Sequence, residues 1–149
     1  MARSSFVYVV YIAATPEAVW KGLTDPESTR QYWGHDNVSD WKPGSAWEHR
    51  KADGSGSVSI AGEVIEARKP HRLLLTWSEH QEKKLRHRQS RVAFEIDALG
   101  EVVRLTLTHD ELEPGSTMER QLASAWSRVL SSLKTLLETG KPLPAWAGR

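Results

Sequence analysis

The chain has 149 residues, of which 39% are hydrophobic and 26% charged, a composition typical of one folded globular domain. Twenty Lys and Arg against nineteen Asp and Glu leave a formal net charge of +1, so no overall field attracts nucleic acid or an anionic membrane. The lack of cysteine excludes a disulfide scaffold, a thiolate metal site and a cysteine nucleophile.

The residue pattern of the N-terminal segment predicts no targeting signal. Its apolar run, residues 6–14, is far shorter than the roughly 20 residues that cross a bilayer, and it does not form a signal-peptide pattern. We therefore expect a cytoplasmic protein without membrane insertion. Because no repeat or linker divides the chain, we expect one domain over residues 1–149, with its core at about 6–140 and a tail at 141–149.

The first third of the chain predicts one strand followed by two short helices. Residues 6–12 are almost all β-branched or aromatic, which favours a strand. Thr15-Pro16-Glu17 and Asp25-Pro26-Glu27 each combine an N-cap residue, a proline at the first helical position and an acidic side chain. The second helix is expected to end near Trp33.

The middle of the chain predicts strands separated by turns. Short segments with alternating or β-branched residues lie between Pro-Gly and Gly-rich turn signals. The expected strands lie at residues 46–50, 57–66, 72–78, 91–97 and 102–108. Together with the first strand, they make about six antiparallel strands.

The end of the chain predicts a long amphipathic helix. Residues 116–119, Ser-Thr-Met-Glu, form a capping box, and apolar residues then recur at helical spacing as far as Leu137. Gly140 and Pro142 provide a stop signal. The order of elements indicates an α+β helix-grip fold, in which a curved antiparallel sheet covers its apolar face with this helix.

Four ordered segments resemble a known family. They are IAATPEAVWKGLTDPESTRQYW at 12–33, WKPGSAWE at 41–48, GEVIEARKPHRLLLTW at 62–77 and AWSRVLSSLKTLLETG at 125–140. Together they resemble the SRPBCC or START-like superfamily, in the branch named after the C-terminal domain of the activator of heat-shock-protein-90 ATPase. The resemblance implies a cavity between the sheet and the closing helix. The eukaryotic co-chaperones of this branch carry an additional N-terminal domain, whereas five residues precede Phe6 here, so we expect a bacterial-type single domain.

The tryptophans indicate an apolar or aromatic small molecule as the ligand. An indole has a large apolar surface and one N–H donor, and Trp33, Trp41 and Trp77 fall near element ends, where a cavity mouth would lie. For Trp20 and Trp126 simple core packing is the favoured interpretation. Strand parity and helical spacing complete the predicted ligand-binding set: Trp33, Trp41, Trp47, Trp77, Phe94, Leu105, Leu107, His109, Met118, Leu122 and Trp126.

Two other functions stay open at this point. The first is an enzyme of the polyketide cyclase or dehydratase kind, which needs an inward ionisable group with a perturbed pKa; His109 is the candidate, although a buried histidine usually makes one satisfied hydrogen bond. The second is a chaperone-linked interaction module, which needs an exposed apolar patch. The tail at 142–147, with Leu143 and Trp146, would supply such a patch or a homodimer contact.

The remaining polar motifs predict no further site. The basic run Lys83, Lys84, Arg86, Arg88 and Arg91 is interrupted by acids and lacks interleaved aromatic residues, so a solvated loop is expected rather than a nucleic-acid partner. Gly54 and Gly56 lead into a strand and indicate a hairpin, not a phosphate loop. The six histidines lack the spacing of a metal site. Neither a metal nor another cofactor is expected, and no catalytic residue is assigned.

Overall fold

A computed structural model describes residues 3–82 and 89–144 of the chain. The described part contains seven β-strands, three α-helices and one short 3₁₀ helix. In chain order these are β1 (Ser4–Ile12), α1 (Pro16–Thr24), α2 (Pro26–Trp33), β2 (His35–Val38), β3 (Ala46–Lys51), β4 (Val58–Arg68), β5 (Arg72–Glu79), η1 (His80–Glu82), β6 (Ser90–Leu99), β7 (Val102–Leu112) and α3 (Thr117–Thr139).

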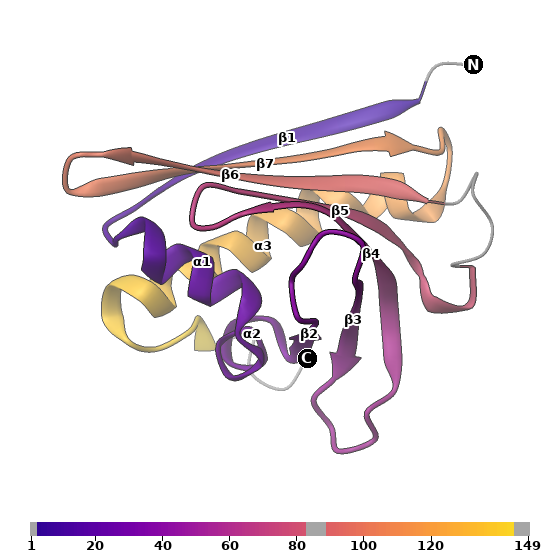
Figure 1. The fold of residues 1–149 in the computed structure, drawn as a ribbon, viewed down its shortest axis with the longest axis horizontal. Coiled ribbons are helices and arrows are strands. Elements are labelled where there is room, and N and C mark those ends of the chain that lie inside the picture. Colours follow the sequence, from indigo (N-terminus) through magenta and orange to yellow (C-terminus); the bar gives the residue numbers. More distant parts are fainter. Residues whose placement is uncertain (1–2, 83–88, 145–149) are drawn as a thin grey trace.

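The strands form one antiparallel sheet in the order β1-β7-β6-β5-β4-β3-β2, so the first strand pairs with the last. The sheet is strongly twisted: the strands run across the view at β1 and stand almost upright at β3 and β4 (Figure 1). Irregular register between His49 and Arg50 and between Val64 and Glu66 marks β-bulges, which increase local twist. The sheet thereby curves around α3.

The predicted α+β helix-grip architecture is confirmed, with one strand more than expected. The additional strand is β2, which has the sequence His-Asp-Asn-Val and therefore little intrinsic β-propensity. It forms because Gly34, at φ 74°, ends α2 in the left-handed conformation and turns the chain towards β3. The sheet consequently has seven strands rather than about six.

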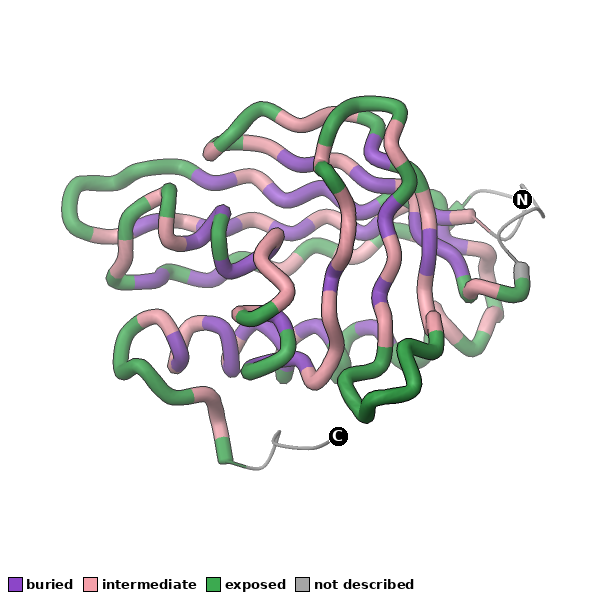
Figure 2. The backbone as a smooth tube through the Cα atoms, turned by 60° about the horizontal axis from the view of Figure 1, so that its bottom comes forward, coloured by how far each residue is buried: buried purple, intermediate pink, exposed green. Residues whose placement is uncertain are grey.

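The core lies between the sheet and α3. Ser116 caps the helix by accepting a hydrogen bond from the Glu119 backbone N–H at 3.1 Å, and Gly140 ends it at φ 86°. The buried face of α3 consists of Leu122, Trp126, Val129, Leu130, Ser132, Leu133 and Leu136. Buried positions also alternate with more exposed ones along the strands (Figure 2). One face of the sheet and one stripe of α3 therefore enclose the apolar interior.

Helix α1 packs closely on α3. A Cβ atom at Gly22 would lie 2.8 Å from Leu133 Cδ1, closer than real Cβ atoms approach a neighbour. The Tyr32 hydroxyl donates to the Gly22 carbonyl at 2.7 Å and ties α2 to the same place. The two short helices thus close one end of the space between sheet and α3. In the described residues, no helix is both long and apolar enough to cross a membrane.

Two predicted segments lie outside the described residues. They are the basic residues Lys83, Lys84, Arg86 and Arg88, and the end of the tail with Trp146.

Candidate functional site

A cleft of about 210 Å³ opens between the sheet and α3. Its lining comes from α2, β4, β5 and α3 and consists of Trp33, Ile60, Trp77, Glu79, Thr117, Met118, Gln121, Leu122, Ala125, Trp126 and Val129. Most of these side chains are apolar, and Glu79 is the only charged one among them. An adjoining hollow of about 500 Å³ shares Ile60 and Glu79 but is lined mainly by polar residues, such as Lys51 and Ser59. The aromatic lining makes the smaller cleft the candidate site.

Three indole rings form the inner wall of the cleft. The centroids of Trp33 and Trp77 lie 6.2 Å apart with nearly parallel planes, and Trp126 lies 5.4 Å from Trp33 and 5.3 Å from Trp77 at steep angles. Offset-stacked and edge-to-face arrangements at these distances are the favourable aromatic geometries. All three side chains are at least 92% buried, so they form a rigid surface with little rotamer freedom left.

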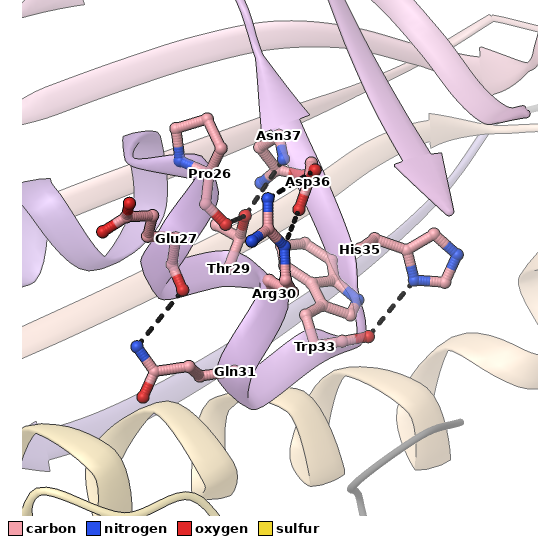
Figure 3. Close-up of polar contacts among 9 residues, drawn as sticks. All are labelled: Pro26, Glu27, Thr29, Arg30, Gln31, Trp33, His35, Asp36 and Asn37. Carbon is pink, nitrogen blue, oxygen red and sulfur yellow. Dashed lines mark hydrogen bonds and ion pairs between the residues drawn. The ribbon is translucent and has the colours of Figure 1, made fainter. Parts of the chain in front are cut away.

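Trp33 is held at the junction of α2 and β2 (Figure 3). Arg30 of α2 forms two hydrogen bonds with the Asp36 carboxylate of β2, at 2.9 and 3.0 Å. The Asn37 backbone N–H donates to the Thr29 hydroxyl at 3.0 Å, and this hydroxyl in turn donates to the Pro26 carbonyl at 3.2 Å. Helix and strand are therefore locked together on both sides of Trp33, the last residue of α2.

Trp126 and Trp77 are connected by a buried polar chain through His109. The Trp126 indole Nε1–H donates to His109 Nδ1 at 3.0 Å, so Nδ1 carries no proton and the proton of the neutral ring sits on Nε2. His109 Nε2–H then donates to the Ser90 hydroxyl at 2.6 Å, and Ser90 donates to the Trp77 carbonyl at 3.1 Å. Each donor in this chain has one acceptor, so the network is satisfied.

His109 is kept neutral by its surroundings. Its side chain is fully buried, and burial lowers its pKa from 6.5 to about 3 because the charged ring would lose its hydration. Both ring nitrogens are engaged in hydrogen bonds, and His109 is not among the residues that line the cleft. The geometry therefore makes His109 a positioning residue for the Trp126 ring.

A second buried polar cluster lies behind Trp33. His49 Nδ1 donates to the Asn37 side-chain oxygen at 2.6 Å, and the His35 ring stacks on His49 with centroids 4.1 Å apart. Burial, and after it the nearby His35, hold the pKa of His49 well below 6.5. The centroid of the His49 ring lies 4.6 Å from that of Trp33, so the two rings are in contact. No pattern in the sequence indicates this cluster, because the four residues of β2 lack the apolar alternation typical of a strand.

Five of the eleven predicted ligand-binding residues line the cleft: Trp33, Trp77, Met118, Leu122 and Trp126. The other six lie elsewhere. Phe94, Leu105, Leu107 and His109 are at least 97% buried in the core. Trp47 is fully buried and donates its indole N–H to the Thr76 carbonyl at 2.8 Å. Trp41 donates to the Thr24 carbonyl at 3.0 Å and thereby fixes the loop after β2 to α1.

Six lining residues were not predicted: Ile60, Glu79, Thr117, Gln121, Ala125 and Val129. Helical spacing contained a signal for some of them, because Gln121, Ala125 and Val129 follow one another at intervals of four residues beside Leu122 and Trp126. The sequence alone does not identify Glu79 and Ile60 as lining residues, because their position follows from the pairing of β4 with β5. In that register the two residues lie opposite each other.

No group of three or more His, Asp or Glu side chains within residues 3–82 and 89–144 is arranged to hold a metal ion.

Comparison with known proteins gives one family and many similar structures. The family model described as Activator of Hsp90 ATPase homolog 1-like protein matches residues 13–138. A dimeric Aha1 from Colwellia psychrerythraea, known from its solution structure, is 18% identical, with a TM-score of 0.76 over 93% of this chain and 98% of that one. CalU16 from Micromonospora echinospora is 20% identical (TM-score 0.70, 97% and 80%). PFC0360w, an HSP90 activator from Plasmodium falciparum, is 24% identical (TM-score 0.73, 89% and 95%). No curated protein matches the sequence.

Proposed function

We propose that this chain, which belongs to the Activator of Hsp90 ATPase homolog 1-like family, binds a small apolar or aromatic molecule between its sheet and α3. The membership confirms the resemblance of the four sequence segments. The observation that carries the proposal is the wall of three tightly packed indoles, Trp33, Trp77 and Trp126, in a cleft whose lining is mostly apolar. Flat apolar rings gain dispersion and burial against such a wall without ordering flexible side chains.

The size of the cleft limits the ligand. Drug-sized ligands occupy pockets of roughly 300–1,000 Å³, whereas an apolar cavity of about 150 Å³ is sufficient for benzene. A cleft of about 210 Å³ therefore suits a molecule with one or two rings, whose remaining atoms extend into solvent.

The chemistry of the lining supports binding rather than catalysis. The enzyme hypothesis required an inward ionisable group, but His109 lies behind Trp126 with both nitrogens hydrogen-bonded. The one ionisable side chain in the lining is Glu79, which is exposed. Turnover of a cyclisable or dehydratable substrate, abolished by His109→Ala, would replace our proposal with the enzyme hypothesis.

The proposed site is tested with a neutral fluorescent probe, N-phenyl-1-naphthylamine, whose emission rises on transfer from water to an apolar site. Ala125 is exposed and lines the cleft, so Ala125→Phe places a ring across the opening without disturbing the core. Ala123 is exposed on the same helix and is not a lining residue, so Ala123→Phe is the matched control. We expect saturable binding by the parent and the control, and at least about tenfold weaker binding, or about 1.4 kcal/mol, by Ala125→Phe.

Chaperone activation is the second candidate, favoured by the description of the matching family and by the similarity to the HSP90 activator from Plasmodium falciparum. Its test is the rate of ATP hydrolysis by an Hsp90 with and without this chain. Acceleration that persists in Ala125→Phe, together with no probe binding by the parent, would establish the interaction function instead.

A further inference from the structure

Strand β1 is an open sheet edge without charge. Its nine residues, Ser4–Ile12, include no Asp, Glu, Lys or Arg. Val7, Val9 and Tyr11 point out of the core and are 59%, 44% and 52% exposed. Among the described residues, β7 is the only strand that pairs with β1. Long, apolar and uncharged edges are the ones that pair with further strands.

The opposite edge of the sheet is protected in the usual ways. β2 has only four residues, and one of them, Asp36, is engaged by Arg30. Short length and charged side chains are the devices by which proteins prevent pairing at an edge. The contrast shows that the open state of β1 is a specific feature of this edge and not of the whole sheet.

The backbone of β1 offers hydrogen-bonding groups on its outer side. The Tyr11 carbonyl accepts from Lys134 Nζ at 2.7 Å, and the Ala13 N–H donates to the Glu138 carboxylate at 2.7 Å. Both contacts come from α3 rather than from β7, so the backbone groups of odd-numbered residues point away from the sheet. By the alternation of an antiparallel ladder, the N–H and C=O groups of Val7 and Val9 have the same direction.

We propose that β1 pairs with β1 of a second copy of this chain, antiparallel and with the two-fold axis at Tyr8. The sequence around Tyr8 is symmetric: Val7 would face Val9 of the second copy, and Val9 would face its Val7. The outward groups of these valines would form four backbone hydrogen bonds. A two-fold interface uses the same patch on both copies, and a strand that is complementary to itself meets this requirement.

The side chains support the same register. The four valines of the two copies would cover one another on the outer face, where they are now exposed to water. On the inner face, Phe6 and Tyr8 are only partly buried against the core and would gain neighbours from the second strand. The contacts of Lys134 and Glu138 lie beyond this central stretch, so both can persist in the dimer. The inference does not depend on ligand binding in the cleft.

The first test is the mass in solution, measured by sedimentation over a concentration series. The parent is expected to approach twice 16.8 kDa with rising concentration. Val7→Lys should remain monomeric, because the pairing would bring its charge against the apolar strand of the second copy. Ile65→Lys is the matched control, since Ile65 is an exposed apolar residue of β4, and it should dimerise like the parent. Circular dichroism melting checks that both variants fold.

The second test uses the lack of cysteine in the chain. Directly opposite residues in a non-hydrogen-bonded antiparallel pair have Cα atoms about 4.5 Å apart, inside the range of about 4.4–6.8 Å that a disulfide requires. Tyr8→Cys should therefore give a covalent dimer on mild oxidation, and Ile65→Cys should not. A parent that is monomeric at every concentration would overturn the proposal. So would a dimer that survives Val7→Lys but is lost when residues 142–149 are removed.

Discussion

Stability should fall below pH 6.5 because His109 is buried in its neutral form. The folded protein holds the pKa of this ring at about 3, whereas in the unfolded chain the pKa returns to about 6.5. Between these two values the unfolded state binds one proton more than the folded state. The free energy of unfolding therefore decreases as the pH is lowered through this window and is insensitive to His109 above it.

The magnitude follows from the width of the window that the experiment crosses. From pH 8 to pH 5, about 1.5 pH units lie below the unfolded pKa, and each corresponds to about 1.36 kcal/mol, so His109 contributes a loss of about 2 kcal/mol. Most carboxyl groups titrate below pH 5 and add little to this difference. His49, whose pKa burial also lowers, adds to the loss in the same direction.

The assay is urea unfolding of the parent and of His109→Gln at pH 8 and pH 5. Glutamine can accept from Trp126 and donate to Ser90 as the histidine does, but it does not titrate. We expect the loss of stability between the two pH values to be about 2 kcal/mol smaller in the variant, whatever its absolute stability. His49→Asn should remove a further part. An equal loss in the parent and in His109→Gln would refute the argument that burial keeps His109 neutral.

Three further predictions concern packing and the basic segment. Gly62→Ala should destabilise the fold by about 3 kcal/mol or more, because the new Cβ would overlap the Thr76 carbonyl oxygen, a backbone atom. Gly100→Ala, where nothing lies within 4 Å, should cost only about 1–2 kcal/mol, and denaturant midpoints measure both changes. Leu122→Trp should lower the free energy of unfolding by less than about 1 kcal/mol and prevent binding of N-phenyl-1-naphthylamine, because the new ring fills the cleft. A decrease of about 1–3 kcal/mol would indicate that the core is solid there. Replacing Lys83, Lys84, Arg86 and Arg88 with Ser should shift the midpoint little, and fluorescence anisotropy with labelled DNA or RNA should detect no sequence-dependent binding by the parent.

The sequence was sufficient for the architecture because its local signals agreed. Proline and acid marked the starts of α1 and α2, the capping box marked α3, and alternating residues marked β6 and β7. The sequence does not predict β2, because its four residues have no apolar alternation. Only their pairing with β3 makes them a strand. Tertiary pairing of this kind overrides local propensity.

The site was predictable only in part. Periodicity placed Met118, Leu122 and Trp126 on the inner stripe of α3, but it could not distinguish a side chain that reaches the cleft from one packed beneath it. Phe94, Leu105 and Leu107 share the correct face of their strands and are nevertheless covered by neighbours. Trp41 lies between β2 and β3, near element ends as expected, and Trp47 lies within β3. The indole N–H groups of both are directed at backbone carbonyls that only the folded chain brings near.

The central claim is that the indole-lined cleft is the binding site. The most direct test is a titration of the ¹⁵N-labelled protein with 1-naphthol, a neutral two-ring aromatic, observed at the tryptophan indole N–H signals. The account predicts saturable shifts of the Trp33 and Trp77 signals, while that of Trp41, which does not line the cleft and donates its indole N–H to the Thr24 carbonyl, stays in place. Unchanged signals of Trp33 and Trp77 up to the solubility limit, or shifts led by Trp41, would contradict it.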